Sequence, residues 1–141
     1  GKDSLEAVFQ EKFVQGVKPL IINFYCQYSA YNEDKADTVD SLLFPHAWRI
    51  GVLGLGKVDP SLYLKAFELG AHGVLVTACK ADTCHFCKEH EWVERRTNYT
   101  AQLISGLGMD TRRFQTHFIS SQNGKEIIDL TFKMVEELRD M

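Results

Sequence analysis

Four short runs of apolar residues recur along the chain, at about residues 20–26, 48–53, 73–78 and 114–120. Each run is too short for a typical helix and is rich in branched or aromatic side chains, which is typical of strands. The apolar residues are nearly continuous instead of alternating with polar ones. Strands with this pattern are buried on both faces, as in a parallel sheet.

The segments between these runs have apolar residues at helical spacing. Asp59-Pro60 supplies an N-cap and a proline at the first helical position, and Gly70 ends the helix that follows. Further helices are expected at about residues 3–15, 35–43, 89–107 and 125–139. In the helix at 89–107, six large apolar residues recur at helical spacing: Trp92, Val93, Tyr99, Leu103, Ile104 and Leu107.

Strands that alternate with helices predict an α/β fold, here a three-layer sandwich with a parallel, flavodoxin- or Rossmann-like sheet of four strands. Right-handed crossovers bring the carboxyl ends of the strands to one edge, and α/β proteins bind their ligands at that edge. We expect residues 20–141 to form this domain. Residues 1–19, which begin without Met, are expected to be a lead-in helix from an upstream part of a larger polypeptide.

Composition narrows the class of protein. Hydrophobic residues make up 45% and charged residues 25% of the 141 residues, as in globular domains with one core. A net charge of −3 gives no basic surface for nucleic acid. No apolar run approaches the ~20 residues of a membrane span, and no signal peptide is evident. Four cysteines are too few for a disulfide scaffold. We therefore expect a cytoplasmic protein whose clustered cysteines hold a metal or do redox chemistry.

The cysteines form the main candidate site. Cys79, Cys84 and Cys87 have the spacing C-x4-C-x2-C directly after a predicted strand, and Cys26 ends an earlier strand. Four thiolates suit a [2Fe–2S] or [4Fe–4S] cluster. Other interpretations remain open at this point: cysteines without a ligand, thiol redox chemistry of the C-x2-C pair, or structural zinc. A zinc site would use the three clustered cysteines with His85 or His90.

Other polar residues carry weaker signals. Gly54-x-Gly56 follows a strand but lacks the remaining features of a dinucleotide site, so a tight backbone approach is expected. We expect His117 to be a hydrogen-bonded core residue, and His46 and His72 to be solvated. Two arginine pairs, Arg95-Arg96 and Arg112-Arg113, are expected to be surface charge or a docking site for an acidic partner. Two tyrosines, Tyr28 and Tyr31, are expected either to shield the cysteines or to pack within their loop.

Several motifs together resemble a known family. The motifs are Phe24-x-Cys26-x-Tyr28, the run DPSLYLKAFELGAHGVLV at residues 59–76, and Cys79-x4-Cys84-His85-Phe86. They resemble the delta (iron–sulfur) subunit family of methyl-viologen-reducing hydrogenase, whose members occur alone or fused to heterodisulfide reductase A-like flavoproteins. The resemblance covers roughly residues 20–140.

The resemblance implies a small α/β electron-transfer module with a [2Fe–2S] cluster. Such modules relay electrons between a hydrogenase or formate dehydrogenase and the flavin-containing, heterodisulfide reductase A-like subunit. They have no substrate site of their own, so no catalytic residue is expected. By this resemblance Cys26, Cys79 and Cys84 occupy cysteine positions of the family.

The chain departs from the family pattern at three places. Ser29 and Gly54 stand where the family has cysteines, and Cys87 is an additional cysteine. Two explanations are possible. In the first, Cys87 replaces a lost ligand, and the ligand set is Cys26, Cys79, Cys84 and Cys87. In the second, the domain has lost its cluster. The alternatives to electron transfer are therefore a cluster-free docking domain of such a complex and a zinc-stabilised interaction domain.

Overall fold

The computed structural model describes residues 18–26, 42–43, 46–52, 54–79, 89–119 and 124–140. The strands are β1 (Ile21–Cys26), β2 (Ala47–Val52), β3 (Gly73–Cys79) and β4 (Phe114–Ile119). The helices are α3 (Pro60–Glu68), α4 (Glu89–Gly106) and α5 (Gly124–Arg139), with short 3-10 helices η1 (Leu55–Lys57) and η2 (Thr111–Arg113). The predicted helix at 3–15, and all but two residues of the one at 35–43, lie outside the described residues.

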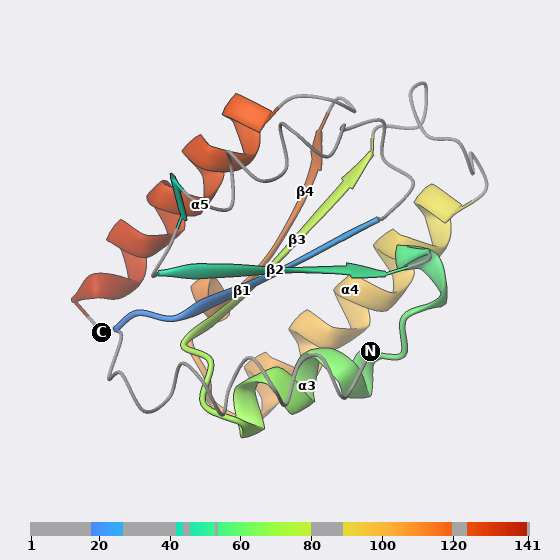
Figure 1. Ribbon diagram of the computed structural model, residues 1–141. Helices are drawn as coiled ribbons and strands as arrows, with labels where there is room; N and C mark the ends of the chain where they lie inside the picture. Colours follow the sequence, from blue (N-terminus) through green and yellow to red (C-terminus); the bar gives the residue numbers. More distant parts are fainter. Residues whose placement is uncertain are drawn as a thin grey trace.

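The four strands form one parallel sheet in the order β2-β1-β3-β4. Helices α3 and α4 cover one face and α5 covers the other, which gives three layers (Figure 1). The predicted α/β sandwich with a parallel flavodoxin-like sheet is therefore confirmed. Among the described helices, none is long and apolar enough to cross a membrane.

The two central strands are buried on both faces, as their continuous apolar pattern predicted. In β1, Ile22 and Phe24 pack into the cluster beneath α3 and α4, whereas Ile21 packs into the cluster beneath α5. In β3, Val74 and Val76 face the first cluster and Leu75 the second. Adjacent residues of a strand point to opposite faces, so each central strand contributes to both cores.

Helix α3 begins as its sequence predicts. The Asp59 carboxylate accepts a hydrogen bond from the Ser61 amide at 2.8 Å, and Pro60 occupies the first turn. The helix buries Tyr63, whose ring centroid lies 5.1 Å from that of Phe24 and 5.4 Å from that of Phe114. These edge-to-face contacts fasten α3 to the sheet.

Helix α4 buries only two of the six large apolar residues that marked it in the sequence, Val93 and Ile104. Its buried residues are Val93, Thr97, Thr100 and Ile104. The hydroxyls of Thr97 and Thr100 donate to the carbonyl oxygens of Val93 and Arg96, each at 2.7 Å. Because these bonds satisfy the hydroxyls within the helix, the threonines can face the core. Three large apolar residues are exposed instead: Trp92 (51%), Tyr99 (54%) and Leu107 (70%).

The start of β3 predicts a testable difference between two glycines. A Cβ atom on Gly73 would lie 2.6 Å from Leu138 Cδ1 and 2.7 Å from Met134 Cε, so the ends of these two buried side chains of α5 must move to admit it. A Cβ atom on Gly106, at the end of α4, would meet nothing within 4 Å. We expect Gly73→Ala to lower the free energy of unfolding by about 1–2 kcal/mol. Gly106→Ala should leave it unchanged or raise it by up to about 1 kcal/mol.

Urea denaturation of the two variants beside the wild type measures both effects. Equal stabilities for the two variants would contradict the close approach of α5 to the sheet.

Candidate functional site

The ends of β1 and β3 define the candidate site. Cys26 is the last residue of β1 and Cys79 the last of β3. These strands are hydrogen-bonded parallel neighbours, so both ends lie at the same edge of the sheet. After β1 the chain forms β2 on one side of it and then β3 on the other. The two strands therefore flank the topological switch point, where doubly wound folds form a crevice for ligands.

The structure describes only part of the predicted ligand set. Cys26 is half-buried and packs against the core cluster beneath α3 and α4. Only the backbone of Cys79 is described, and Cys84 and Cys87 lie outside the described residues. Ser29, His85 and the tyrosines Tyr28 and Tyr31 lie outside them as well. Within the described ranges, no three His, Cys, Asp or Glu side chains are grouped as metal ligands. The shared cysteine site remains a prediction.

His90, a ligand in the zinc hypothesis, lies in the first turn of α4. Its ring centroid is 4.3 Å from that of Phe118, the penultimate residue of β4. Phe118 pairs with Ala78, the residue before Cys79. Helix α4 therefore begins at the same edge of the sheet at which β3 and β4 end.

A buried polar network that sequence analysis missed crosses the sheet on the side of α5. Asn23 is fully buried, and its amide nitrogen donates to the Leu75 carbonyl at 3.0 Å and the Thr77 hydroxyl at 3.1 Å. Its side-chain oxygen accepts from Arg49 Nε at 3.1 Å, and the Arg49 guanidinium lies 4.0 Å from the Tyr25 ring centroid. The network joins the middle of β2, β1 and β3. In the sequence, this network is indicated only by an asparagine, Asn23, within an otherwise apolar strand.

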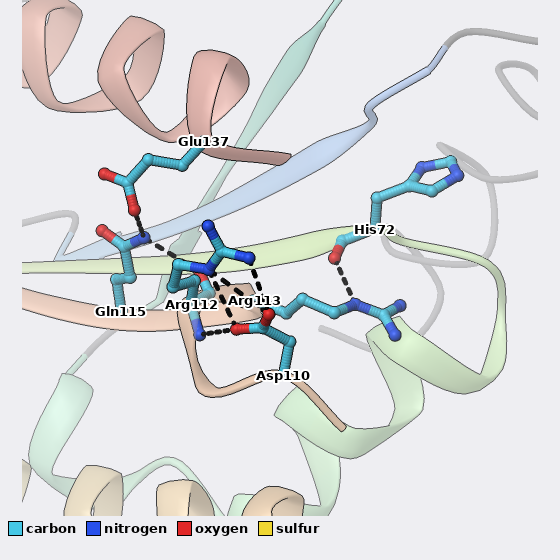
Figure 2. A network of polar contacts seen from close by, with 6 residues as sticks. All are labelled: His72, Asp110, Arg112, Arg113, Gln115 and Glu137. Carbon is cyan, nitrogen blue, oxygen red and sulfur yellow. Dashed lines mark hydrogen bonds and ion pairs between the residues drawn. The ribbon is translucent and has the colours of Figure 1, made fainter. Parts of the chain in front are cut away.

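A second network closes the opposite, amino edge of the sheet (Figure 2). Arg113 Nε donates to the His72 carbonyl at 2.7 Å. Arg112 binds the Asp110 carboxylate with two guanidinium nitrogens, and Gln115 donates to the Arg112 carbonyl and to Glu137. The Arg112 hydrogen bonds hold the pKa of Asp110 at about 2. Arg113 therefore ties η2 to the residue before β3, and Gln115 ties β4 to α5.

The predictions for two of the histidines were wrong. His72 is half-buried, and its Nδ1 accepts a hydrogen bond from the Leu20 amide at 2.9 Å. His46 is half-buried too, with Nδ1 3.2 Å from the Pro19 carbonyl. Both tie the segment before β1 to its neighbours, so they are structural residues and not solvated ones. His117 is hydrogen-bonded, as predicted: its Nε2 lies 3.2 Å from the side-chain oxygen of Gln115. It is half-buried on an edge strand, however, and not in the core.

Gly54 and Gly56 are both buried and belong to the turn around η1, which contacts α4. The Val58 carbonyl that follows accepts a hydrogen bond from Arg96 of α4 at 3.1 Å. This segment therefore packs between the sheet and α4, and the cysteine loop beside which a tight backbone approach was expected lies outside the described residues.

A family model described as methyl-viologen-reducing hydrogenase, delta subunit, matches residues 21–141. The chain belongs to this family. One relative is the vhc iron–sulfur subunit of the F420-non-reducing hydrogenase of Methanococcus voltae. It is 30% identical over 111 residues, which are 77% of this chain and 76% of that protein. The vhu iron–sulfur subunit of the F420-non-reducing hydrogenase of Methanococcus maripaludis is 25% identical over 125 residues, 88% of this chain and 93% of that protein.

A longer relative matches this chain over a small part of its own length. It is the A-type subunit of the ferredoxin/F420H2-dependent CoB-CoM heterodisulfide reductase of Methanosarcina acetivorans, 27% identical over 124 residues, which are 87% of this chain. The chain spans 16% of that protein's length. Segments similar to this chain thus occur both in proteins of about its own length and within a much longer polypeptide.

The Asn23 network predicts a stability effect. Asn23→Leu removes an acceptor of the half-buried Arg49 Nε and the donor to two buried oxygens. We expect it to lower the free energy of unfolding by about 2–4 kcal/mol, because charged and buried polar groups lose hydrogen bonds. Thr77→Val, the matched change on β3, removes one side-chain acceptor and should cost less, about 1 kcal/mol. Urea denaturation measures both; a larger loss for Thr77→Val would contradict the central role of Asn23.

His72 predicts a dependence of stability on pH. Burial, with the charges of Arg113 and Lys18, lowers the pKa of His72 below 6.5. Between this lowered pKa and 6.5 the unfolded chain binds more protons than the folded one, so the free energy of unfolding decreases as pH falls through this window. Burial lowers the pKa of His117 as well, with the same sign.

The test is His72→Asn, because an asparagine oxygen can accept the Leu20 hydrogen bond without titrating. Denaturation curves at about pH 7.5, 6.5 and 5.5, which bracket the ordinary histidine pKa, should show a smaller loss of stability in this variant than in the wild type. The same loss in both proteins would show that His72 does not contribute.

Proposed function

We propose that the chain is an electron-transfer module of an oxidoreductase complex of the hydrogenase and heterodisulfide reductase type. The observation that carries the proposal is the position of Cys26 and Cys79 at the ends of the two strands that flank the switch point. The C-x4-C-x2-C motif begins at the second of these ends. Relatives that cover most of this chain are named iron–sulfur subunits, which supports the same proposal.

The ligand set that we propose is Cys26, Cys79, Cys84 and Cys87, holding a [2Fe–2S] cluster. The donor chemistry fits, because four thiolates are the usual complement of such a cluster. When bound, the cluster accepts and releases single electrons. Cys26 would hold it against the apolar cluster beneath α3 and α4, into which its side chain packs. Such apolar packing limits solvent access and so affects the redox potential.

The partners that we propose are a flavin-containing, heterodisulfide reductase A-like protein and, on the other side of the relay, a hydrogenase or formate dehydrogenase. The heterodisulfide reductase relative from Methanosarcina acetivorans carries a segment similar to this chain within one polypeptide, which supports the first partner. The chain would pass electrons without binding a substrate of its own.

A cluster-free docking domain is the second candidate. Ser29 and Gly54 favour it, because they stand where the resemblance places family cysteines. Gly54 is buried and extended, at the start of the turn that packs against α4. In this hypothesis the domain would position neighbouring subunits and hold no iron. Structural zinc, with His90 or His85 as a ligand, is a third.

Iron and sulfide analysis of protein purified and reconstituted without oxygen separates these hypotheses. We expect about two iron atoms and two sulfides per chain, with visible absorption that bleaches on reduction. Cys79→Ala and Cys87→Ala should each lose most of the iron, because each removes one of four ligands. A cluster-free domain would hold no iron in any variant, and a zinc domain would hold zinc alone.

A measurement of folding separates loss of iron from loss of the folded structure. Far-UV circular dichroism of Cys87→Ala, compared with that of the wild type, shows whether iron is lost without loss of the fold. If Cys87 holds no metal, its change to alanine should alter the free energy of unfolding by no more than about 0.5 kcal/mol. Iron contents that are equal in wild type and Cys87→Ala would remove Cys87 from the ligand set.

A further inference from the structure

The exposed side of α4 carries large side chains that the fold does not use. Trp92 and Tyr99 are seven residues apart in the sequence, so they lie on the same side of the helix two turns from each other. They are 51% and 54% exposed. Exposed single apolar residues are ordinary, but two aromatic residues aligned on one helix form a row. The core beneath α4 is filled by Val93, Ile104 and the two internally bonded threonines.

Arg95 lies between the two aromatic residues along the helix. Its guanidinium carbon is 5.5 Å from the Trp92 ring centroid, close enough for a cation–π contact. Arg96 lies 5.9 Å from the same centroid but is half-buried and donates to the Val58 carbonyl. Arg96 therefore stabilises the packing of α4 on the segment after η1. Arg95 is exposed and forms no ion pair within the part of the chain that the structure describes.

The row Trp92–Arg95–Tyr99 lies next to the candidate cysteine site. It begins five residues after Cys87, near the start of a helix whose first turn packs on Phe118 at the carboxyl edge of the sheet. In Figure 1 the first turns of α4 lie at the same end of the molecule as the arrowhead of β3. Cys26 packs into the core on the face that α4 covers. A protein bound to this row would thus lie beside the carboxyl edge.

We propose that Trp92, Arg95 and Tyr99 form the docking surface for the flavoprotein partner, whose contact patch has an apolar pocket bordered by Asp or Glu carboxylates. The inference rests on the proposed function for the identity of the partner. Tryptophan, tyrosine and arginine are the residues that carry most binding energy at protein interfaces. Electron transfer also requires that the partner bind close to the cysteine edge.

Charge complementarity specifies the partner's chemistry. Arg95 is the exposed cation of the row, and Glu91 and Glu94 are exposed carboxylates of the same helix. A carboxylate of the partner is therefore attracted at Arg95 and repelled at the neighbouring glutamates. This alternation fixes how the partner is oriented along α4.

Binding of the purified flavoprotein from the same organism, with its flavin bound, tests the surface. We expect Trp92→Ala and Tyr99→Ala each to increase Kd about tenfold or more. Arg95→Gln should increase it several-fold and reduce its dependence on salt, because a rim charge contributes through screened attraction. Phe132→Ala is the matched control: it removes a 41% exposed aromatic residue from α5, on the opposite face of the sheet. Its Kd should equal that of the wild type.

Iron content, measured on the same samples, separates this inference from the proposed function. If every variant contains iron and only the α4 variants bind the flavoprotein more weakly, both the docking surface and the proposed cluster are supported. Weaker binding of the α4 variants in a protein without iron supports the docking surface and overturns the cluster. A Kd in the α4 variants equal to that of Phe132→Ala overturns the surface whatever the iron content. Absence of binding by the wild type, or a wild-type dimer that Trp92→Ala dissociates, overturns the assignment of the partner.

Discussion

Burial of β1 and β3 on both faces is the constraint on which the rest of the structure depends. These neighbouring strands supply apolar side chains to the cluster beneath α3 and α4 and to the cluster beneath α5. A helix layer is therefore required on each side of the sheet, because either face left open would expose the core to water. Asn23 of β1 and Thr77 of β3 are polar exceptions. They are hydrogen-bonded to each other, and the further bonds of Asn23 to β2 and β3 permit it to be fully buried.

The same arrangement gives the two edges of the sheet different roles. At the amino edge, His72 accepts a hydrogen bond from the Leu20 amide, and Arg113 and Gln115 donate to neighbouring segments. At the carboxyl edge, β1 and β3 flank the switch point and end in Cys26 and Cys79. Polar residues at the amino edge are thus used for stability, which leaves the carboxyl edge for the chemistry proposed for this delta-subunit domain.

Helix α4 connects the core to the proposed interface. Two threonines occupy core positions because their hydroxyls bond to carbonyls one turn earlier. With the core filled in this way, Trp92 and Tyr99 are left exposed on α4. The choice of buried residues in one helix therefore determines which aromatic residues are available to a partner, and it places them next to the edge that carries the cysteines.

The sequence by itself determined the elements and their class: continuous apolar runs predicted the buried parallel strands, and Asp59-Pro60 predicted the start of α3. It also predicted that Cys26 and Cys79 end strands at one edge of the sheet. The end of a strand is visible in the local sequence, and right-handed crossovers are a general rule that brings parallel strand ends to one edge. Only the tertiary structure decided the partners of Asn23 and His72, whose hydrogen bonds join residues 52 positions apart. Helical spacing likewise did not show which side of α4 is buried, because hydrophobicity alone does not reveal that a threonine hydroxyl is satisfied within its own helix. Contacts between distant segments and the internal satisfaction of polar groups are properties of the folded chain, and no pattern of neighbouring residues encodes them.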